Sequence, residues 1–263
     1  MQLDRIEAIV RPRNPWESLD LGFSMVRRWW KPLYKVWFVL VLPIFVTIYL
    51  LFSFFEGSLW LALLMTWWWL KPLYDRILLH FLSHALFGEQ PSIRQTLKVL
   101  PRLLFNTHMF SALTLRRFDF ARSFNLPVWQ LEGSQGRVAY QRLKMLKKNT
   151  RSTAAWLTIV CMLFEWVLLL SLFGLVYLMM PITYTFDLFY ALVHEQALWA
   201  EILRMISTLF ALSVVEPLYV AGGFALYLNR RTHLEGWDID LAFRRIAAHF
   251  SVLSDQDFKG FKP

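Results

Sequence analysis

Three charged side chains interrupt long apolar stretches of the sequence. Glu165 is the only charge in residues 153–180, Glu216 is the only charge in residues 205–228, and Lys71 follows the thirteen uncharged residues 58–70. A charged group near the middle of a bilayer is costly unless it is paired or protonated. Such groups therefore mark an ion or proton pathway, a structural pair, or a contact with a partner subunit.

The depths of these three residues allow them to meet. Counting about 1.5 Å per residue, Lys71 lies roughly 20 Å and Glu216 roughly 17 Å from the outer surface, and Glu165 lies about 18 Å from the cytoplasmic surface. Lys71 could then pair with Glu216 and hold two helices together. A partner contact or an ion pathway at the same residues remains open.

A second group of ionisable residues shares one helix face. Arg76, His80 and His84 recur every four residues. Two histidines with this spacing hold a metal when a third ligand joins them, but no cysteine or acidic residue completes the pattern. We expect the stripe to face solvent or lipid headgroups, and we expect no metal and no cofactor.

Common catalytic motifs are missing from the sequence. It contains no Gly-rich phosphate loop, no Gly-x-Ser-x-Gly turn and no His-Glu-x-x-His pair. We therefore expect no catalytic residue and no enzymatic activity. The basic residues 88–152 carry no nucleic-acid-binding module, so we expect anionic lipid or an acidic protein surface as their partner, and no nucleic acid.

The composition predicts an all-α membrane protein that positions these charges. Of 263 residues, 57% are apolar and 17% aromatic, against roughly 45–50% apolar in soluble domains. A spanning helix needs about 20 mainly apolar residues. We predict one membrane domain with four transmembrane helices, at residues 36–55, 57–87, 153–180 and 203–229.

The chain has a net charge of +9. The distribution of its basic residues indicates how the helices are oriented in the membrane. Twelve Lys and Arg lie in residues 88–152, seven precede residue 36 and six follow residue 228, whereas residues 181–200 have none. Cytoplasmic loops carry the excess of Lys and Arg. We therefore expect both termini in the cytoplasm. No cleavable signal peptide is visible in residues 1–31, so we expect insertion through the first span.

Two amphipathic segments are expected at the cytoplasmic interface. Residues 18–35 mix tryptophans with basic residues, which favours a helix at headgroup depth. The loop of residues 88–152 contains a similar pattern that is too short to span. Alternatively, residues 103–115 cross the membrane, but five crossings would place the basic tail of residues 230–263 outside, which the charge rule disfavours.

The tripeptide Pro-Leu-Tyr occurs at residues 32–34, 72–74 and 217–219. The last two copies fall at nearly one depth in two parallel spans, which a repeat of two helical hairpins would explain. A chance match of common residues is the alternative.

The residues after the last span carry a more specific pattern. Glu235, Gly236 and Asp238 form a Glu-Gly-x-Asp sequence. This sequence, like residues 19–30 and 86–94, is similar to segments found in one group of proteins. This chain resembles bacterial uncharacterised multi-span proteins related to the membrane domain of some glycerophosphodiester phosphodiesterases. Asn229 stands where that group usually has Asp. The resemblance implies the bacterial inner membrane and an accessory role beside membrane-anchored proteins, including transglutaminase-like ones, with no catalytic residue.

We expect an inner-membrane scaffold or anchoring subunit of a cell-envelope complex, acting through protein and lipid contacts. The alternative is a transporter or lipid-handling protein with a path past Glu165 and Glu216. In the first case the two glutamates and Lys71 form a buried pair or partner contact. A cytoplasmic collar would bind anionic headgroups, and its expected residues are Arg76, Arg230, Arg231, Glu235 and Asp238.

Overall fold

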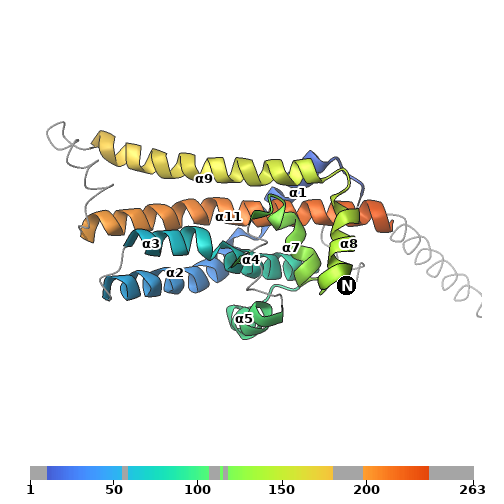
Figure 1. The fold of residues 1–263 in the computed structure, drawn as a ribbon, viewed down its shortest axis with the longest axis horizontal. Helices are drawn as coiled ribbons and strands as arrows, with labels where there is room; N and C mark the ends of the chain where they lie inside the picture. The colour runs from blue at the N-terminus through green and yellow to red at the C-terminus, as the bar shows by residue number, and fades with distance from the viewer. Residues whose placement is uncertain (1–10, 55–58, 107–112, 115–117, 180–197, 237–263) are drawn as a thin grey trace, which may run out of the picture.

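The computed structural model describes residues 11–54, 59–106, 113–114, 118–179 and 198–236. These residues form helices and no strand (Figure 1). The helices are α1 (Pro15–Arg28), α2 (Trp30–Phe54), α3 (Leu59–Leu64), the π-helix η2 (Met65–Trp69), α4 (Lys71–Leu86), α5 (Ile93–Asn106), α7 (Arg122–Gln130), α8 (Gly136–Lys147), α9 (Arg151–Met179) and α11 (Leu198–Glu235).

Three of these helices are long and apolar enough to cross a membrane. They are α2, α9 and α11, whose most apolar windows have mean hydropathies of 2.5, 2.5 and 1.7. All three run along the long axis of the molecule (Figure 1). They coincide with the predicted spans at residues 36–55, 153–180 and 203–229, so the prediction of an all-helical, multi-pass membrane protein is confirmed.

The continuous helix predicted over residues 57–87 is wrong. The described part of this segment is divided into α3, η2 and α4, with a break at Leu70. The Leu70 N–H donates to the Met65 carbonyl, five residues back, at 3.0 Å. Pro72 lies in the first turn of α4, where its missing N–H costs nothing. No helix in the described part of this segment is long enough to span alone.

Helix α11 lies at the centre of the bundle. In its apolar window 78% of residues are buried, compared with 33% in α2 and 11% in α9. Glycine allows two other helices to approach it closely. A Cβ on Gly22 of α1 would lie 2.5 Å from the Ala221 carbonyl oxygen, and one on Gly223 would lie 2.3 Å from the Ser123 Oγ of α7. These two contacts fix α1 and α7 against α11.

The interfacial helix expected over residues 18–35 is also different in the structure. Its first part belongs to α1, which starts at the Asn14 cap and ends at Arg28, and α2 begins two residues later. Leu19 and Met25 are buried, because α1 packs along α11. The segment is therefore part of the bundle.

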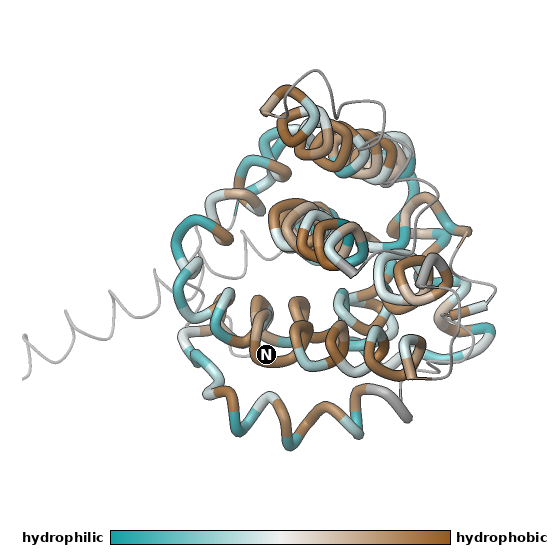
Figure 2. Tube along the Cα trace, turned by 90° about the vertical axis from the view of Figure 1, so that its left-hand side faces the viewer, coloured by the Kyte–Doolittle hydropathy of each residue, from teal (hydrophilic) through white to brown (hydrophobic). Residues whose placement is uncertain are grey.

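Helix α5 crosses the bundle beneath the long helices (Figures 1 and 2). It occupies the loop where an amphipathic helix is predicted, and it packs against α4 and α2. Thr96 is buried, whereas Arg94, Lys98 and Arg102 are exposed on the opposite side. Most of the alternative span at residues 103–115 lies outside the described residues.

Candidate functional site

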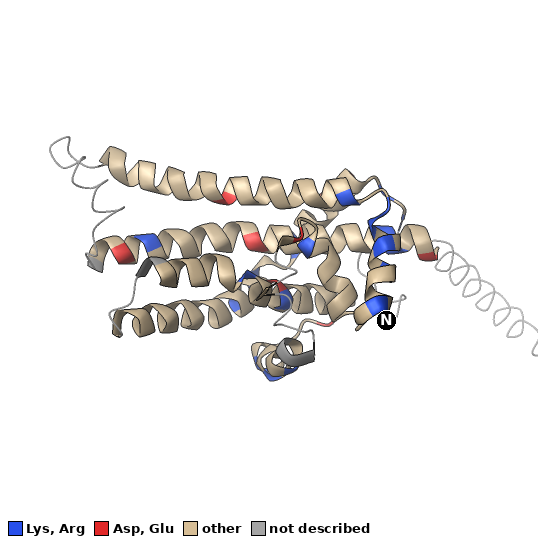
Figure 3. Cartoon of the chain, in the orientation of Figure 1, with Lys and Arg blue, Asp and Glu red and all other residues tan. Residues whose placement is uncertain are grey.

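The structure brings Lys71, Glu165 and Glu216 together. The Lys71 Nζ lies 2.6 Å from the Glu165 Oε2 and 3.2 Å from the Glu216 Oε2. The side chains of both glutamates are 1% exposed, and that of Lys71 is 13% exposed. The Trp67 Nε1 donates to the Glu165 Oε1 at 2.7 Å. Figure 3 shows that most of α9 carries no charged residue, and Glu165 is the only acidic residue of that helix.

Two further charged residues extend this cluster, and neither is among the site residues expected from the sequence. The Arg122 Nε lies 3.0 Å from the Asp75 Oδ2, and its Nη2 lies 3.8 Å from the Glu216 Oε1. Asp75 is one turn after Lys71 on α4, so the pattern of α4 could have suggested it. Arg122 is one of the twelve cations assigned to the cytoplasmic loop. Only the folding of α7 onto α11 brings it to Glu216.

The five residues form one chain of alternating charge: Glu165, Lys71, Glu216, Arg122 and Asp75. With three carboxylates and two cations, the formal charge of the chain is −1. Among the described residues, no hydrogen bond of good geometry reaches either oxygen of Glu216 or of Asp75. Their cations lie at ion-pair distance but outside hydrogen-bonding geometry. The acceptor capacity of these buried carboxylates is thus only partly used.

Tyr219 of α11 places Arg122 within the cluster. The guanidinium of Arg122 lies over the Tyr219 ring, 5.6 Å from its centroid. The Tyr219 hydroxyl accepts a hydrogen bond from the Ser123 backbone N–H at 3.3 Å and lies 3.3 Å from the Thr158 Oγ1. The start of α7 is therefore tied to both α11 and α9.

A cavity of about 560 Å³ adjoins the cluster between η2, α9 and α11. Its floor is charged and buried, because it contains Lys71, Arg122, Glu165 and Glu216. Its rim is apolar and more exposed. The rim residues with large exposed side chains are Leu64, Trp68, Phe118, Phe120, Met162 and Trp166.

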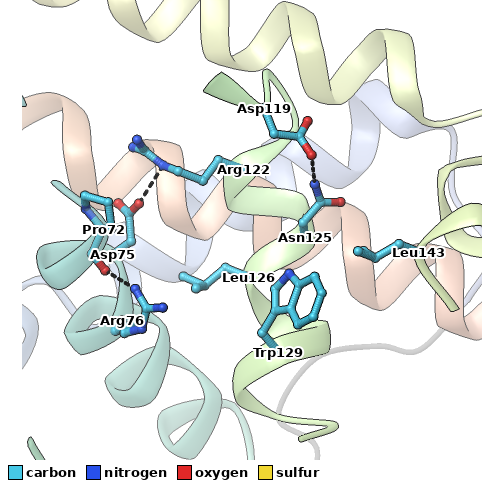
Figure 4. Close-up of a pocket in the computed structure, with 9 residues that line it drawn as sticks. All are labelled: Pro72, Asp75, Arg76, Asp119, Arg122, Asn125, Leu126, Trp129 and Leu143. Carbon is cyan, nitrogen blue, oxygen red and sulfur yellow. Dashed lines mark hydrogen bonds and ion pairs between the residues drawn. The ribbon is translucent and has the colours of Figure 1, made fainter. Parts of the chain in front are cut away.

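A smaller cavity of about 60 Å³ lies on the other side of Arg122 (Figure 4). Arg122 and Asp119 line both cavities. In Figure 4 the Arg122–Asp75 ion pair lies at one end of the small cavity, and Asp119 bonds to Asn125 at 2.7 Å near the other. The small cavity has room for a few water molecules, because about 10–15 Å³ of such volume is enough for one. Arg122 and Asp119 are thus part of the wall that the two cavities share.

Arg76 does not join a headgroup-binding collar. It is 1% exposed, it lines the small cavity, and its Nη1 donates to the Pro72 carbonyl at 2.7 Å. The rest of its stripe also faces protein, because His80 is 8% exposed and its ring lies 4.3 Å from that of His84. The prediction that Arg76, His80 and His84 face solvent or lipid headgroups is therefore wrong. Helix α4 is covered on nearly all sides, which a four-residue spacing alone cannot reveal.

Arg230, Arg231 and Glu235 lie on α11 rather than in a tail, because that helix continues to Glu235. The Arg231 Nη2 lies 2.6 Å from the Glu235 Oε2, and Arg142 of α8 contacts Glu235 as well. Arg142 also lies 2.9 Å from the Glu132 Oε2. This hydrogen bond with Glu132, with a further contribution from Glu235, raises the pKa of Arg142 despite partial burial.

The structure thus uses Arg231 and Glu235 to tie α8 to α11. Arg230 is half-buried. Asp238 lies outside the described residues.

Comparisons with family models, curated proteins and solved structures give no match to this chain. The resemblance to bacterial multi-span membrane proteins therefore stays a prediction, and the charged cavity is the main basis for proposing a function.

Proposed function

We propose that this chain is a lipid-handling membrane protein, which binds an amphiphile in the cavity between η2, α9 and α11. One observation carries the proposal: a buried ionic floor opens through an apolar, exposed rim. A polar head would bind at the floor while its apolar tail remains among lipid chains. The volume of about 560 Å³ falls within the range of small-molecule sites, about 300–1,000 Å³.

The expected membrane placement supports this proposal. Glu165 lies about 18 Å along the helical rise from the start of the apolar run at Thr153, which is close to the middle of a hydrocarbon core of about 30 Å. The rim would then face acyl chains. We propose four crossings in the bacterial inner membrane, with both termini cytoplasmic and α3, η2 and α4 together forming the second crossing.

The break at η2 is compatible with a membrane crossing. Irregular backbone at membrane depth is tolerated where it is buried in protein or lines a cavity. Trp67 and Trp68 of η2 line the cavity, and Lys71 follows directly after the break. The π-helix therefore lies where an irregular turn is tolerated, and π-turns are frequent at functional sites.

Cys161 provides a direct test, because it is the only cysteine of the chain and lines the cavity. The rate of its alkylation by N-ethylmaleimide is measured in nanodiscs, with and without a short-chain phospholipid. If the phospholipid occupies the cavity, a concentration ten times its Kd slows alkylation about tenfold.

Met162→Trp, which fills the rim, should abolish this concentration-dependent protection. The matched control is Leu163→Trp, because Leu163 is 55% exposed on the same helix and does not line the cavity. An alkylation rate of the wild-type protein that no phospholipid changes would refute the proposal.

A second candidate function is the scaffold subunit of a cell-envelope complex. It is favoured by α9, whose apolar window is only 11% buried and whose outward side chains include Trp156, Phe164 and Leu170. Its partner would be a membrane-anchored subunit, of which transglutaminase-like proteins are the candidates.

A photocrosslinker replacing Phe164 in native membranes tests this candidate, with the same crosslinker at Met162 as the control. A specific crosslink to such a subunit from position 164 alone supports a scaffold. Crosslinks to lipid only, from both positions, exclude it.

A further inference from the structure

Two buried carboxyl groups lie side by side next to the small cavity, and the proposed lipid site does not depend on them. Asp75 is 1% exposed and lines this cavity (Figure 4). Its carboxyl group and that of Glu216 lie within hydrogen-bonding reach of each other. An ionised carboxylate has acceptors but no donor, so two ionised groups at this distance repel. A single proton would turn the contact of this acid pair, Asp75 and Glu216, into a hydrogen bond.

The hydrogen bonds of the cluster indicate where an extra proton belongs. Three carboxylates face two cations, so full ionisation leaves a formal charge of −1. The oxygens of Glu165 accept hydrogen bonds from Trp67 at 2.7 Å and from Lys71 at 2.6 Å. Among the described residues, the oxygens of the acid pair accept no hydrogen bond of good geometry. A proton on the acid pair supplies the missing donor and brings the formal charge to zero.

Among the described residues, the groups around Asp75 provide it with one cation at ion-pair distance. Arg122 of α7 is that cation, at 3.0 Å, and the Tyr219 hydroxyl of α11 is engaged by α7 and α9. On α4 itself, Lys71 lies between two glutamates, and Arg76 donates to a backbone carbonyl. Helices α2 and α5, which also pack on α4, carry their cations at exposed positions, and η2 carries no charge.

We infer that Asp75 binds a proton at neutral pH and donates it in a hydrogen bond to Glu216. Glu216 is the partner that stays ionised, because Lys71 and Arg122 both lie at ion-pair distance from it. The small cavity of about 60 Å³ connects Asp75 with Asp119, whose side chain is 40% exposed. Water in this cavity would carry protons to Asp75 from the side that the proposed topology makes cytoplasmic. The acid pair is thus a proton-binding site.

Infrared spectroscopy of the protein in a maltoside detergent, which has no carbonyl group, tests this inference. A protonated carboxyl group has a C=O stretch at higher frequency than ionised carboxylates and amides. Wild-type protein at neutral pH should show this band, and Asp75→Asn should lose it. Asp20→Asn, at an exposed position on α1, is the control and should keep the band. A difference spectrum between wild type and Asp75→Asn without a protonated carboxyl band overturns the inference.

Isotope labelling makes the test independent of whether Asp75→Asn folds. Wild-type protein is produced with aspartate that carries a heavy carbon isotope in its side-chain carboxyl group. The band should shift to lower frequency, because Asp75 is the only buried aspartate among the described residues. An unshifted band belongs to a glutamate and overturns the assignment to Asp75. In deuterated water the band should shift within minutes, and a band that persists for hours overturns the route through the small cavity.

Discussion

Replacing Lys71 by Met should destabilise the protein more than any single removal of a carboxylate from the cluster. Lys71 lies within 2.6 Å of one buried glutamate and within 3.2 Å of another. Its loss changes the formal charge of the chain from −1 to −2. Loss of the terminal charge through Glu165→Gln changes it from −1 to 0. The two variants therefore change the formal charge of the chain in opposite directions.

The magnitude follows from the burial of these groups. Removing one partner of a buried ion pair costs about 3–5 kcal/mol, because the other charge stays buried without compensation. Lys71 compensates two carboxylates, so we expect Lys71→Met to cost at least about 3 kcal/mol. Glu165→Gln keeps one oxygen acceptor for the Trp67 hydrogen bond but loses the acceptor of the Lys71 hydrogen bond, while Lys71 keeps Glu216 as its partner. We expect it to cost about 1–2 kcal/mol, less than Lys71→Met.

Thermal unfolding in detergent, followed by size-exclusion chromatography, measures the difference. At about 2–4 °C per kcal/mol for a chain of this size, Lys71→Met should lower the Tm by about 6 °C or more. Lys98→Met on the exposed face of α5 is the control and should stay within about 2 °C. The bridging role of Lys71 is refuted if Lys71→Met unfolds within about 2 °C of the wild type, or if Glu165→Gln costs more than Lys71→Met.

Three further predictions test the surrounding structure. Gly223→Ala forces its Cβ into α7 and should lower the free energy of unfolding by about 1–3 kcal/mol, measured by thermal unfolding. Gly174→Ala is the control and should be neutral, because the space around Gly174 is open. Equal effects of the two variants would contradict the close approach of α7 to α11. Arg142→Ala should increase amide hydrogen exchange in α8, because it removes the bonds to α11, and the exposed Lys144→Ala should not; unchanged exchange in the first variant argues against this tie. Reporter fusions should place residue 190 outside and the C terminus in the cytoplasm, and a C terminus found outside would contradict the four-span topology.

Part of the site can be located from the sequence, because a charge within an apolar membrane helix is energetically costly. Glu165 and Glu216 stand out because a lone charge in an apolar run has few explanations. The helical rise also places Lys71 at a matching depth. The ion pair of Lys71 with Glu216 follows from these two facts, since a charge at that depth needs a partner. The ion pair of Lys71 with Glu165 is not predicted, because the depth of Glu165 does not assign it a partner. The three long helices can be predicted equally well, because length and hydropathy determine them.

Arg122 and the break at η2 cannot be predicted in this way. Arg122 lies in a segment rich in Lys and Arg, where the positive-inside rule accounts for every cation alike. Its burial depends on the contact of Ser123 with Gly223, which lies far away in the sequence. Local patterns contain no information on such a contact.

The π-turn before Pro72 cannot be recognised in the sequence, because the pattern of an apolar run is the same whether its hydrogen bonds reach four or five residues back.

The break at η2 also explains why a charged cavity exists in this bundle. A regular helix through residues 59–86 would keep one hydrogen-bond pattern, and its side chains would advance by a fixed angle of about 100° per residue. The π-turn that ends at Leu70 adds a residue to one turn and rotates the helix after it. Lys71 then points to Glu165 on one side of the break, while Trp67 reaches the same carboxylate from the other side. A Lys71→Met variant and a deletion of one residue in η2 should therefore both uncouple α9 from the cluster, but only the deletion would also rotate α4 and its Asp75 away from Arg122.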